Sequence, residues 1–204
     1  ERPAWYELKM TKDLKGVMGG KALRGVLCNY FSSRIYTGKI GLLQVAKYLE
    51  AALPPGERRA LIVTDSFTEK YAARVTEHLD LVGMEHRVWP AAEPEVPLSS
   101  VDAGAAVCEE FRPTAIFALG GGSVMDTVKM MLVRYERPEL DLRMIFPFTS
   151  LGLRKKARYF IAIPTTSGTG SEVTAVAVAT DTARTPHKKL EVFCDEFFAD
   201  MTVL

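Results

Sequence analysis

The sequence predicts an α/β protein with a doubly wound, mainly parallel sheet of the Rossmann-like kind. Strand-like and helix-like segments alternate along the chain with short joints between them. The apolar run at 60–63 is continuous, as expected for a strand that is buried on both faces of a parallel sheet. Two later strand-like runs each lead directly into a loop of glycines or hydroxyl side chains. These three observations together favour this class.

The first half of the chain has clear elements only after residue 33. Residues 1–33 mix glycines with scattered apolar residues, and we expect an N-terminal extension or an edge hairpin there, before a dinucleotide-binding domain over 34–204. Helices are expected where apolar residues recur at helical spacing, and strands where short apolar runs lie between turn residues. The expected elements are a strand at 34–37, a helix at 40–53 that PPG ends, a strand at 59–64, a helix at 68–81 and a strand at 84–89.

The second half continues the alternation. After a proline-rich loop, Ser99 is expected to cap a helix that runs to about Phe111. Ser123 and Asp126 have the spacing of a capping box, so a helix is expected to begin there and to reach Tyr135. The remaining expected elements are a strand at 114–119, a long loop with a partial helix at 136–157, and strands at 159–163, 173–180 and 187–193.

Two loops carry the functional signal. GGGS at 120–123 and PTTSGTGSE at 164–172 each follow a predicted strand. In an open parallel sheet, ligands bind at the carboxyl ends of the strands. Glycines let a diphosphate approach the main chain, and the helix that follows presents unpaired N–H groups and the positive end of its dipole. Either loop alone is compatible with an ordinary turn, and GGGS matches neither a Rossmann nor a P-loop fingerprint. The two together predict a site for a phosphorylated ligand.

Asp65 follows the strand at 59–64, where an acidic side chain commonly meets the ribose of a dinucleotide. A carboxylate there accepts hydrogen bonds from the ribose hydroxyls and repels a 2′-phosphate, which predicts NAD rather than NADP. The alternative is that Asp65 only caps the following helix beside Ser66. The two roles are compatible.

Composition excludes several other classes of function. The 26 basic and 25 acidic residues are spread along the chain and give a net charge of +1, so no concentrated basic face for nucleic acid is expected. No apolar stretch approaches the roughly 20 residues of a membrane span, and the N-terminus lacks a signal pattern. Cys28, Cys108 and Cys194 have no CxxC spacing, and we expect reduced thiols. A cytoplasmic protein that is not bound to a membrane is therefore expected.

GGGSVMDTVK at 120–129 and IPTTSGTGSEVT at 163–174 resemble the iron-containing (group III) alcohol dehydrogenases. IVTDS at 62–66 and IYTGK at 35–39 resemble the opening of the same family, so the resemblance runs from about residue 34 to the end. It implies an oxidoreductase that transfers a hydride between NAD(H) and an alcohol or aldehyde. The cofactor-binding residues that it implies are Asp65, Gly121, Gly122, Ser123, Asp126, Lys129, Thr165, Thr166 and Thr169, with Asp126 and Lys129 deeper towards the nicotinamide.

The same resemblance implies an all-helical C-terminal domain beyond the equivalent of Leu204. In the family that domain carries the metal ligands, one aspartate and three histidines. His78, His86 and His187 match none of those positions, so neither a metal ligand nor a catalytic residue is expected in this chain. We expect the cofactor-binding half of a longer homo-oligomeric enzyme, whose missing half holds iron or zinc. Alone, this half is expected to bind NAD(H) with little or no turnover.

Two rival functions stay open. One is a related reaction of the same superfamily, such as polyol or glycerol phosphate oxidation, against which the form of the PTTSGTGSE loop argues. The other is a non-catalytic nucleotide-binding module, which gains weight only if 204 residues is the natural length.

Overall fold

A six-stranded sheet organises the computed structural model, which describes residues 33–145 and 150–204. All neighbouring strands in it are parallel, in the order β1-β8-β5-β4-β2-β3. The central strands β2 and β4 are almost completely buried, which explains their continuous apolar sequence. The strands are β1 (Arg34–Tyr36), β2 (Arg59–Thr64), β3 (Glu85–Trp89), β4 (Ala115–Gly120), β5 (Tyr159–Pro164) and β8 (Met201–Val203).

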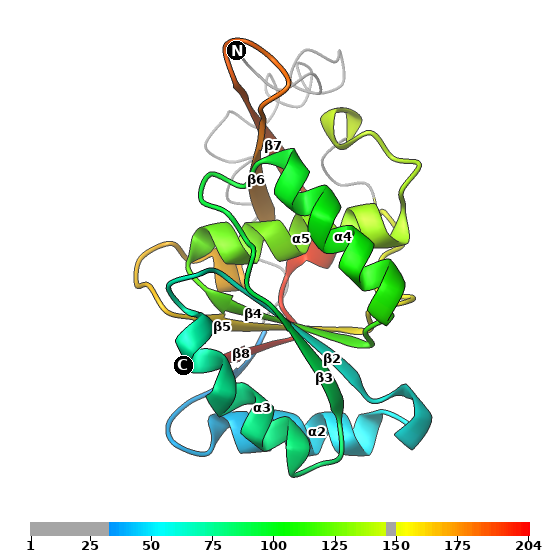
Figure 1. Cartoon of the computed structure of the whole chain (residues 1–204), viewed down its shortest axis with the longest axis vertical. Helices are drawn as coiled ribbons and strands as arrows, with labels where there is room; N and C mark the ends of the chain where they lie inside the picture. The colour runs from blue at the N-terminus through cyan, green and yellow to red at the C-terminus, as the bar shows by residue number, and fades with distance from the viewer. Residues whose placement is uncertain (1–32, 146–149) are drawn as a thin grey trace, which may run out of the picture.

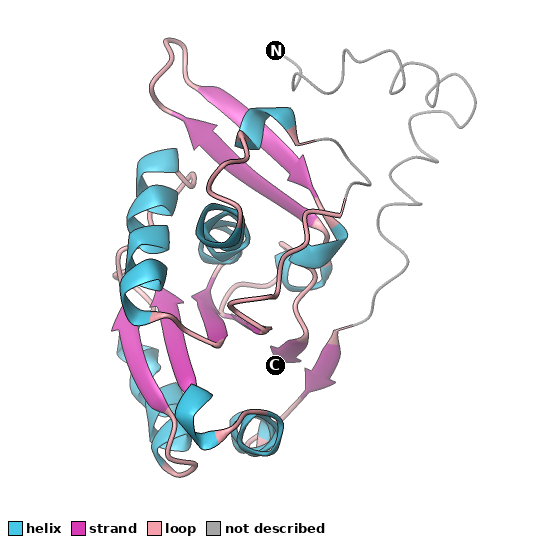
Figure 2. Ribbon diagram, turned by 90° about the vertical axis from the view of Figure 1, so that its right-hand side faces the viewer, coloured by secondary structure: helices cyan, strands magenta, loops and turns pink. Residues whose placement is uncertain are grey.

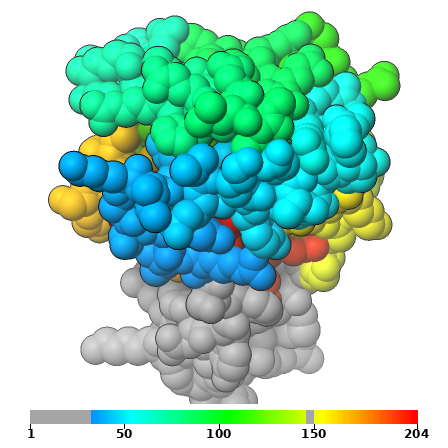
Figure 3. Space-filling view, turned by 90° about the horizontal axis from the view of Figure 1, so that it is seen from below, coloured from blue at the N-terminus to red at the C-terminus, as the bar shows by residue number. Residues whose placement is uncertain are grey.

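Among the described residues, two α-helices cover each face of this sheet (Figure 1). Helices α2 (Gly41–Ala52) and α3 (Ala72–Asp80) lie on one face, and their residues form much of the described surface in Figure 3. Helices α4 (Leu98–Phe111) and α5 (Gly122–Glu136) lie on the other face. The sheet therefore separates two apolar cores. No helix in the described ranges is both long enough and apolar enough to cross a membrane.

An antiparallel hairpin packs outside α5 and enlarges the core on that side. It consists of β6 (Val176–Asp181) and β7 (Lys188–Phe193), which pair with each other and not with the main sheet (Figure 2). Short 3₁₀ turns complete the described fold: η2 (Pro55–Glu57), η3 (Glu69–Tyr71), η4 (Leu142–Met144), η5 (Ser171–Val173) and η6 (Asp195–Phe197).

The order of the strands reverses between β2 and β4. From β2 the chain continues to β3 on one side, and from β4 it continues to β5 on the other side. Ligands of open α/β sheets bind in the crevice at the carboxyl ends of the strands at such a reversal. The fold therefore brings Asp65, which follows β2, and the turn at 120–123, which follows β4, to one crevice.

The predicted fold class and most predicted elements are confirmed. The helix expected at 68–81 is divided into η3 and α3, and the strand expected at 173–180 begins as η5 before β6. Strand β8 was not predicted, because three residues are too few to establish an apolar period. The N-terminal extension or edge hairpin expected at 1–33 lies, apart from Ser33, outside the described residues.

The predicted cap at Ser99 is wrong. The N-cap of α4 is Pro97, two residues before Ser99, so the helix begins at Leu98, and it has no side-chain cap hydrogen bond. Pro97 is held at φ −63°, and its carbonyl accepts from the Ser100 amide at 3.0 Å, which starts the helix before Ser99.

Cys108 of α4 and Cys194, which follows β7, are both buried in the core on the α4 and α5 side of the sheet, and this makes their reactivity predictable. Burial raises the pKa of the Cys108 and Cys194 thiols to about 12. At pH 8 both stay protonated, so we expect a thiol reagent to modify them at least ~100-fold more slowly in native protein than in urea. Peptide mapping by mass spectrometry measures each site. Equal rates in both conditions would contradict the buried placement.

The raised pKa values of these two thiols also affect stability. Because the thiols ionise more readily in the unfolded chain, they destabilise the fold only as the pH rises above 9, where the unfolded thiols ionise.

Candidate functional site

A cleft of about 380 Å³ opens at the reversal of strand order. The segments that follow β2, β3, β4 and β5 line it, as expected for the carboxyl ends of neighbouring parallel strands. The predicted site residues that line this cleft are Asp65, Gly121, Gly122, Ser123, Thr165 and Thr166.

The second loop lies directly against the glycine turn and leaves little room for a side chain on Gly121 or Gly122. Gly121 is the N-cap of α5, at φ −83° and ψ −170°, and the helix begins at Gly122. A Cβ added to Gly121 would lie 3.1 Å from Thr166 Oγ1, and one added to Gly122 would lie 3.3 Å from Thr169 Cβ. The first N–H groups of a helix have no partner within it. The turn therefore offers unpaired donors on a surface that any larger residue would fill.

Asp65 is held rigidly at the rim of the cleft. Its Oδ1 accepts from the backbone N–H of Phe67 at 2.9 Å and of Thr68 at 2.8 Å, and from Thr68 Oγ1 at 2.8 Å. Among the described residues Oδ2 accepts no hydrogen bond. The alternative role of Asp65 was to cap the following helix, but the N-cap of η3 is Thr68 and that of α3 is Tyr71. Asp65 instead supports the local turn before η3, and this leaves one carboxylate oxygen for a ligand.

Asp126 and Lys129 lie behind the second loop and do not line the cleft. The capping box predicted for Asp126 is wrong: Asp126 Oδ1 accepts from Ser171 Oγ at 2.6 Å, and Oδ2 accepts from the Val178 amide at 3.0 Å. Lys129 is fully buried, and its Nζ donates to the Ser171 and Val176 carbonyls, both at 2.7 Å. Burial lowers the pKa of Lys129 to about 8, against the opposing effects of the nearby carboxylates.

Sequence reasoning missed several residues of the cleft. Phe67 and Thr68 follow Asp65, and Ala92, Glu93 and Pro94 come from the proline-rich loop after β3. Phe67 is 76% exposed, which gives the cleft an apolar wall beside its polar turn. The loop after β3 could have been predicted to line the cleft, because β3 is parallel to β2 and ends at the same edge of the sheet as β2 and β4.

The described residues do not supply a metal site. No three His, Cys, Asp or Glu side chains within 33–145 and 150–204 lie close enough together to hold an ion. A metal is therefore not assigned to these residues.

Several known proteins are similar to this chain in sequence. The family model described as iron-containing alcohol dehydrogenase matches residues 32–204. The bifunctional aldehyde-alcohol dehydrogenase AdhE of Escherichia coli (strain K12) is 43% identical over 156 residues, which is 70% of this chain and 17% of that protein. The NADPH-dependent butanol dehydrogenase of Clostridium saccharobutylicum is 38% identical over 151 residues, which is 72% of this chain and 37% of that protein.

Solved structures confirm the fold. The sulfoacetaldehyde reductase of Bifidobacterium kashiwanohense, solved in complex with NAD⁺, superposes with a TM-score of 0.69 at 28% identity. The match covers 87% of this chain and 46% of that one. This chain thus spans less than half the length of these relatives.

Proposed function

The chain belongs to the iron-containing alcohol dehydrogenase family, and we propose on that premise that residues 34–204 are the dinucleotide-binding domain of an NAD-dependent alcohol or aldehyde oxidoreductase. The observation that carries the proposal is the contact between the glycine turn and the second hydroxyl loop at the reversal of strand order. Both loops are needed, because the turn offers N–H donors and the second loop offers hydroxyl donors.

Each part of the cleft suits one part of a dinucleotide. Gly121, Gly122 and Ser123 receive the diphosphate at the N-terminus of α5. Asp65 Oδ2 accepts from the ribose hydroxyls, and the apolar wall at Phe67 packs against the adenine. Thr165 and Thr166 of the second loop line the cleft and donate to the diphosphate and to the second ribose. Thr169 lies against Gly122 beside the cleft, and its hydroxyl adds a third donor from the same loop. Asp126 and Lys129 do not line the cleft, and they belong to the proposed site as support for the second loop.

The proposed reaction moves a hydride between the alcohol carbon and the nicotinamide, while the hydroxyl proton leaves and a carbonyl forms. The chemistry is that of the cofactor, and this chain binds, orients and shields it. The family name implies iron, which would polarise the substrate oxygen in the whole protein. Since the described residues offer no ligand set, iron or zinc belongs to the proposal only for the longer protein.

Two features of the whole protein also belong to the proposal. A cytoplasmic location agrees with the free thiols Cys108 and Cys194, because reducing compartments keep thiols unpaired. A homo-oligomer agrees with β1, which is an edge strand among the described residues and whose Ile35 is 56% exposed, since an edge strand can pair with another chain.

Calorimetric titration of this chain with NAD⁺ and, separately, NADP⁺ tests the cofactor proposal. We expect saturable binding of NAD⁺ at least ~10-fold tighter than that of NADP⁺, because the Asp65 carboxylate meets a hydroxyl in one case and a phosphate in the other. Tighter NADP⁺ binding would reverse the cofactor assignment. No heat of binding with either nucleotide at millimolar concentration would refute the proposed function.

A further inference from the structure

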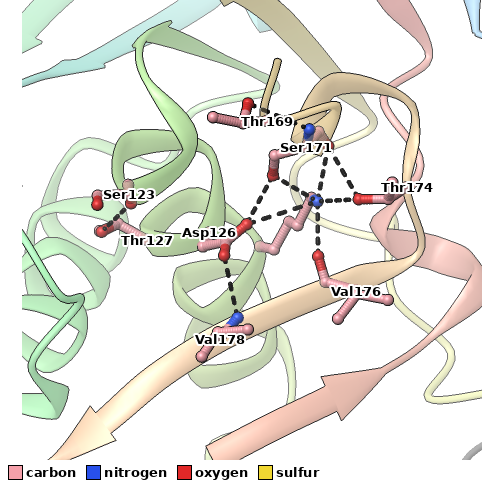
Figure 4. A network of polar contacts seen from close by, with 9 residues as sticks. Ser123, Asp126, Thr127, Thr169, Ser171, Thr174, Val176 and Val178 are labelled. Carbon is pink, nitrogen blue, oxygen red and sulfur yellow. Dashed lines mark hydrogen bonds and ion pairs between the residues drawn. The ribbon is translucent and has the colours of Figure 1, made fainter. Parts of the chain in front are cut away.

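Lys129, which is buried, and Asp126, which is partly buried, connect α5 to the segment that follows the second loop (Figure 4). Lys129 Nζ donates to the carbonyl and the hydroxyl of Ser171, at 2.7 Å and 2.9 Å, and to the Val176 carbonyl at 2.7 Å. A weaker contact of 3.4 Å reaches Thr174 Oγ1. All of these partners lie between η5 and the start of β6.

Asp126 completes the connection from the same face of the helix. It accepts from Ser171 Oγ at 2.6 Å and from the Val178 amide at 3.0 Å, while its Oδ1 lies 3.7 Å from Lys129 Nζ. Both carboxylate oxygens are thus engaged by protein groups. A fully buried ammonium whose acceptors belong to one short segment fixes the position of that segment, because any displacement would leave the charge without partners.

The other end of the second loop is fixed as well. The Thr165 amide donates to the Gly120 carbonyl at 3.0 Å, where β5 and β4 end side by side. Between these two anchors the loop turns through Gly168 at φ +99° and Gly170 at φ +64°, both in the region that favours glycine. Loop residues 166–170 therefore depend on the Asp126–Lys129 pair for their position against the glycine turn.

We propose that Asp126 and Lys129 are positioning residues, which clamp the end of the second loop to α5 and so hold its threonines against the diphosphate-binding turn. This inference rests on the proposed function, since the position of the loop matters for binding only if a dinucleotide occupies the cleft. The proposal assigns these two side chains to the loop and not to the ligand.

The first arm of the test needs no ligand. We compare amide hydrogen exchange in the wild-type chain and in Lys129→Met, which keeps the length of the side chain and removes its charge. The clamp predicts at least tenfold faster exchange at 166–173, with strand β4 unchanged. Equal exchange at 166–173 in the two proteins overturns the proposal.

Thr127→Val is the matched control. Thr127 is also fully buried on α5, but its hydroxyl donates to the Ser123 carbonyl at 2.8 Å within the same helix, away from the second loop (Figure 4). Exchange at 166–173 is expected to stay at the wild-type rate in this variant.

If Lys129→Met does not fold, Ser171→Ala replaces it. This change removes the hydroxyl that Asp126 and Lys129 share, and it leaves no charge unpaired. About threefold faster exchange at 166–173 is then expected.

The second arm measures NAD⁺ affinity against pH. The clamp predicts about tenfold weaker binding for Lys129→Met at pH 7. Lys129 faces the carboxylates of Asp126 and Glu172, and its pKa is about 8. As the pH rises from 7 to 9.5, its ammonium therefore loses a proton, and with it one of the three N–H donors. The wild-type affinity should therefore fall by about threefold over this range, whereas that of Lys129→Met should stay level.

The two arms separate the two proposals. Unchanged NAD⁺ affinity in Lys129→Met, with faster exchange of the loop, overturns the positioning role. A wild-type chain that binds no NAD⁺ refutes the proposed function instead, and the exchange arm alone then decides whether the clamp exists.

Discussion

Gly121→Val is expected to weaken NAD⁺ binding at least ~100-fold, equivalent to about 2.8 kcal/mol, while the protein stays folded. A Cβ on Gly121 would already lie 3.1 Å from Thr166 Oγ1, and both residues line the cleft, so the larger valine side chain would push the second loop away from the turn that is proposed to hold the diphosphate. The φ of −83° at Gly121 is open to valine, so the backbone itself is not strained. Titration calorimetry measures the affinity, and thermal unfolding followed by circular dichroism verifies the fold.

Gly56→Val is the matched control for this substitution. Gly56 lies in η2, and no heavy atom comes within 4 Å of the position of an added Cβ. The same chemical change is therefore made where there is open space and no cleft. We expect NAD⁺ affinity within a factor of two of the wild type. Wild-type affinity in a folded Gly121→Val protein would place the diphosphate elsewhere.

The sequence was most informative where several independent signals agreed. The continuous apolar runs of β2 and β4 could be recognised because a strand covered by helices on both faces needs no polar face. Asp65 and the turn at 120–123 could be placed in one crevice because parallel strands end at a common edge. The structure confirms that both line the same cleft.

The failures at Asp126 and Lys129 have a common cause, which is that contacts with residues far along the chain outweighed local preferences. Ser123 and Asp126 have the spacing of a capping box, but Asp126 bonds instead to Ser171 and Val178, which lie far along the chain. The spacing of two residues cannot predict a partner that folding brings from another element. The buried state of Lys129 was hidden in the same way, since a lysine on a helix is ordinarily exposed.

A change at Asp65 is expected to reverse part of the preference for NAD⁺ without disturbing the turn that Asp65 supports. Asp65→Asn keeps an oxygen that can accept from the Phe67 and Thr68 amides, as Oδ1 does now at 2.9 Å and 2.8 Å. It removes the negative charge. A carboxylate and a 2′-phosphate about 5 Å apart at a partly exposed site repel by about 1–3 kcal/mol. The NAD⁺/NADP⁺ affinity ratio should therefore fall by roughly 10- to 100-fold, chiefly through tighter NADP⁺ binding.

Asp65→Gly distinguishes the effect of the Asp65 charge on cofactor preference from the effect of its side chain on the stability of the turn. It removes the same charge together with the acceptor Oδ1, so it should change the cofactor preference as much as Asp65→Asn does. It should in addition lower the free energy of unfolding by about 1 kcal/mol, the usual cost of losing such a local acceptor. Titrations with both nucleotides and urea unfolding of the three proteins distinguish these effects. If Asp65→Asn leaves NADP⁺ affinity unchanged while the turn stays intact, Asp65 acts only on the backbone around it, and the preference for NAD⁺ must be sought among the other residues of the cleft.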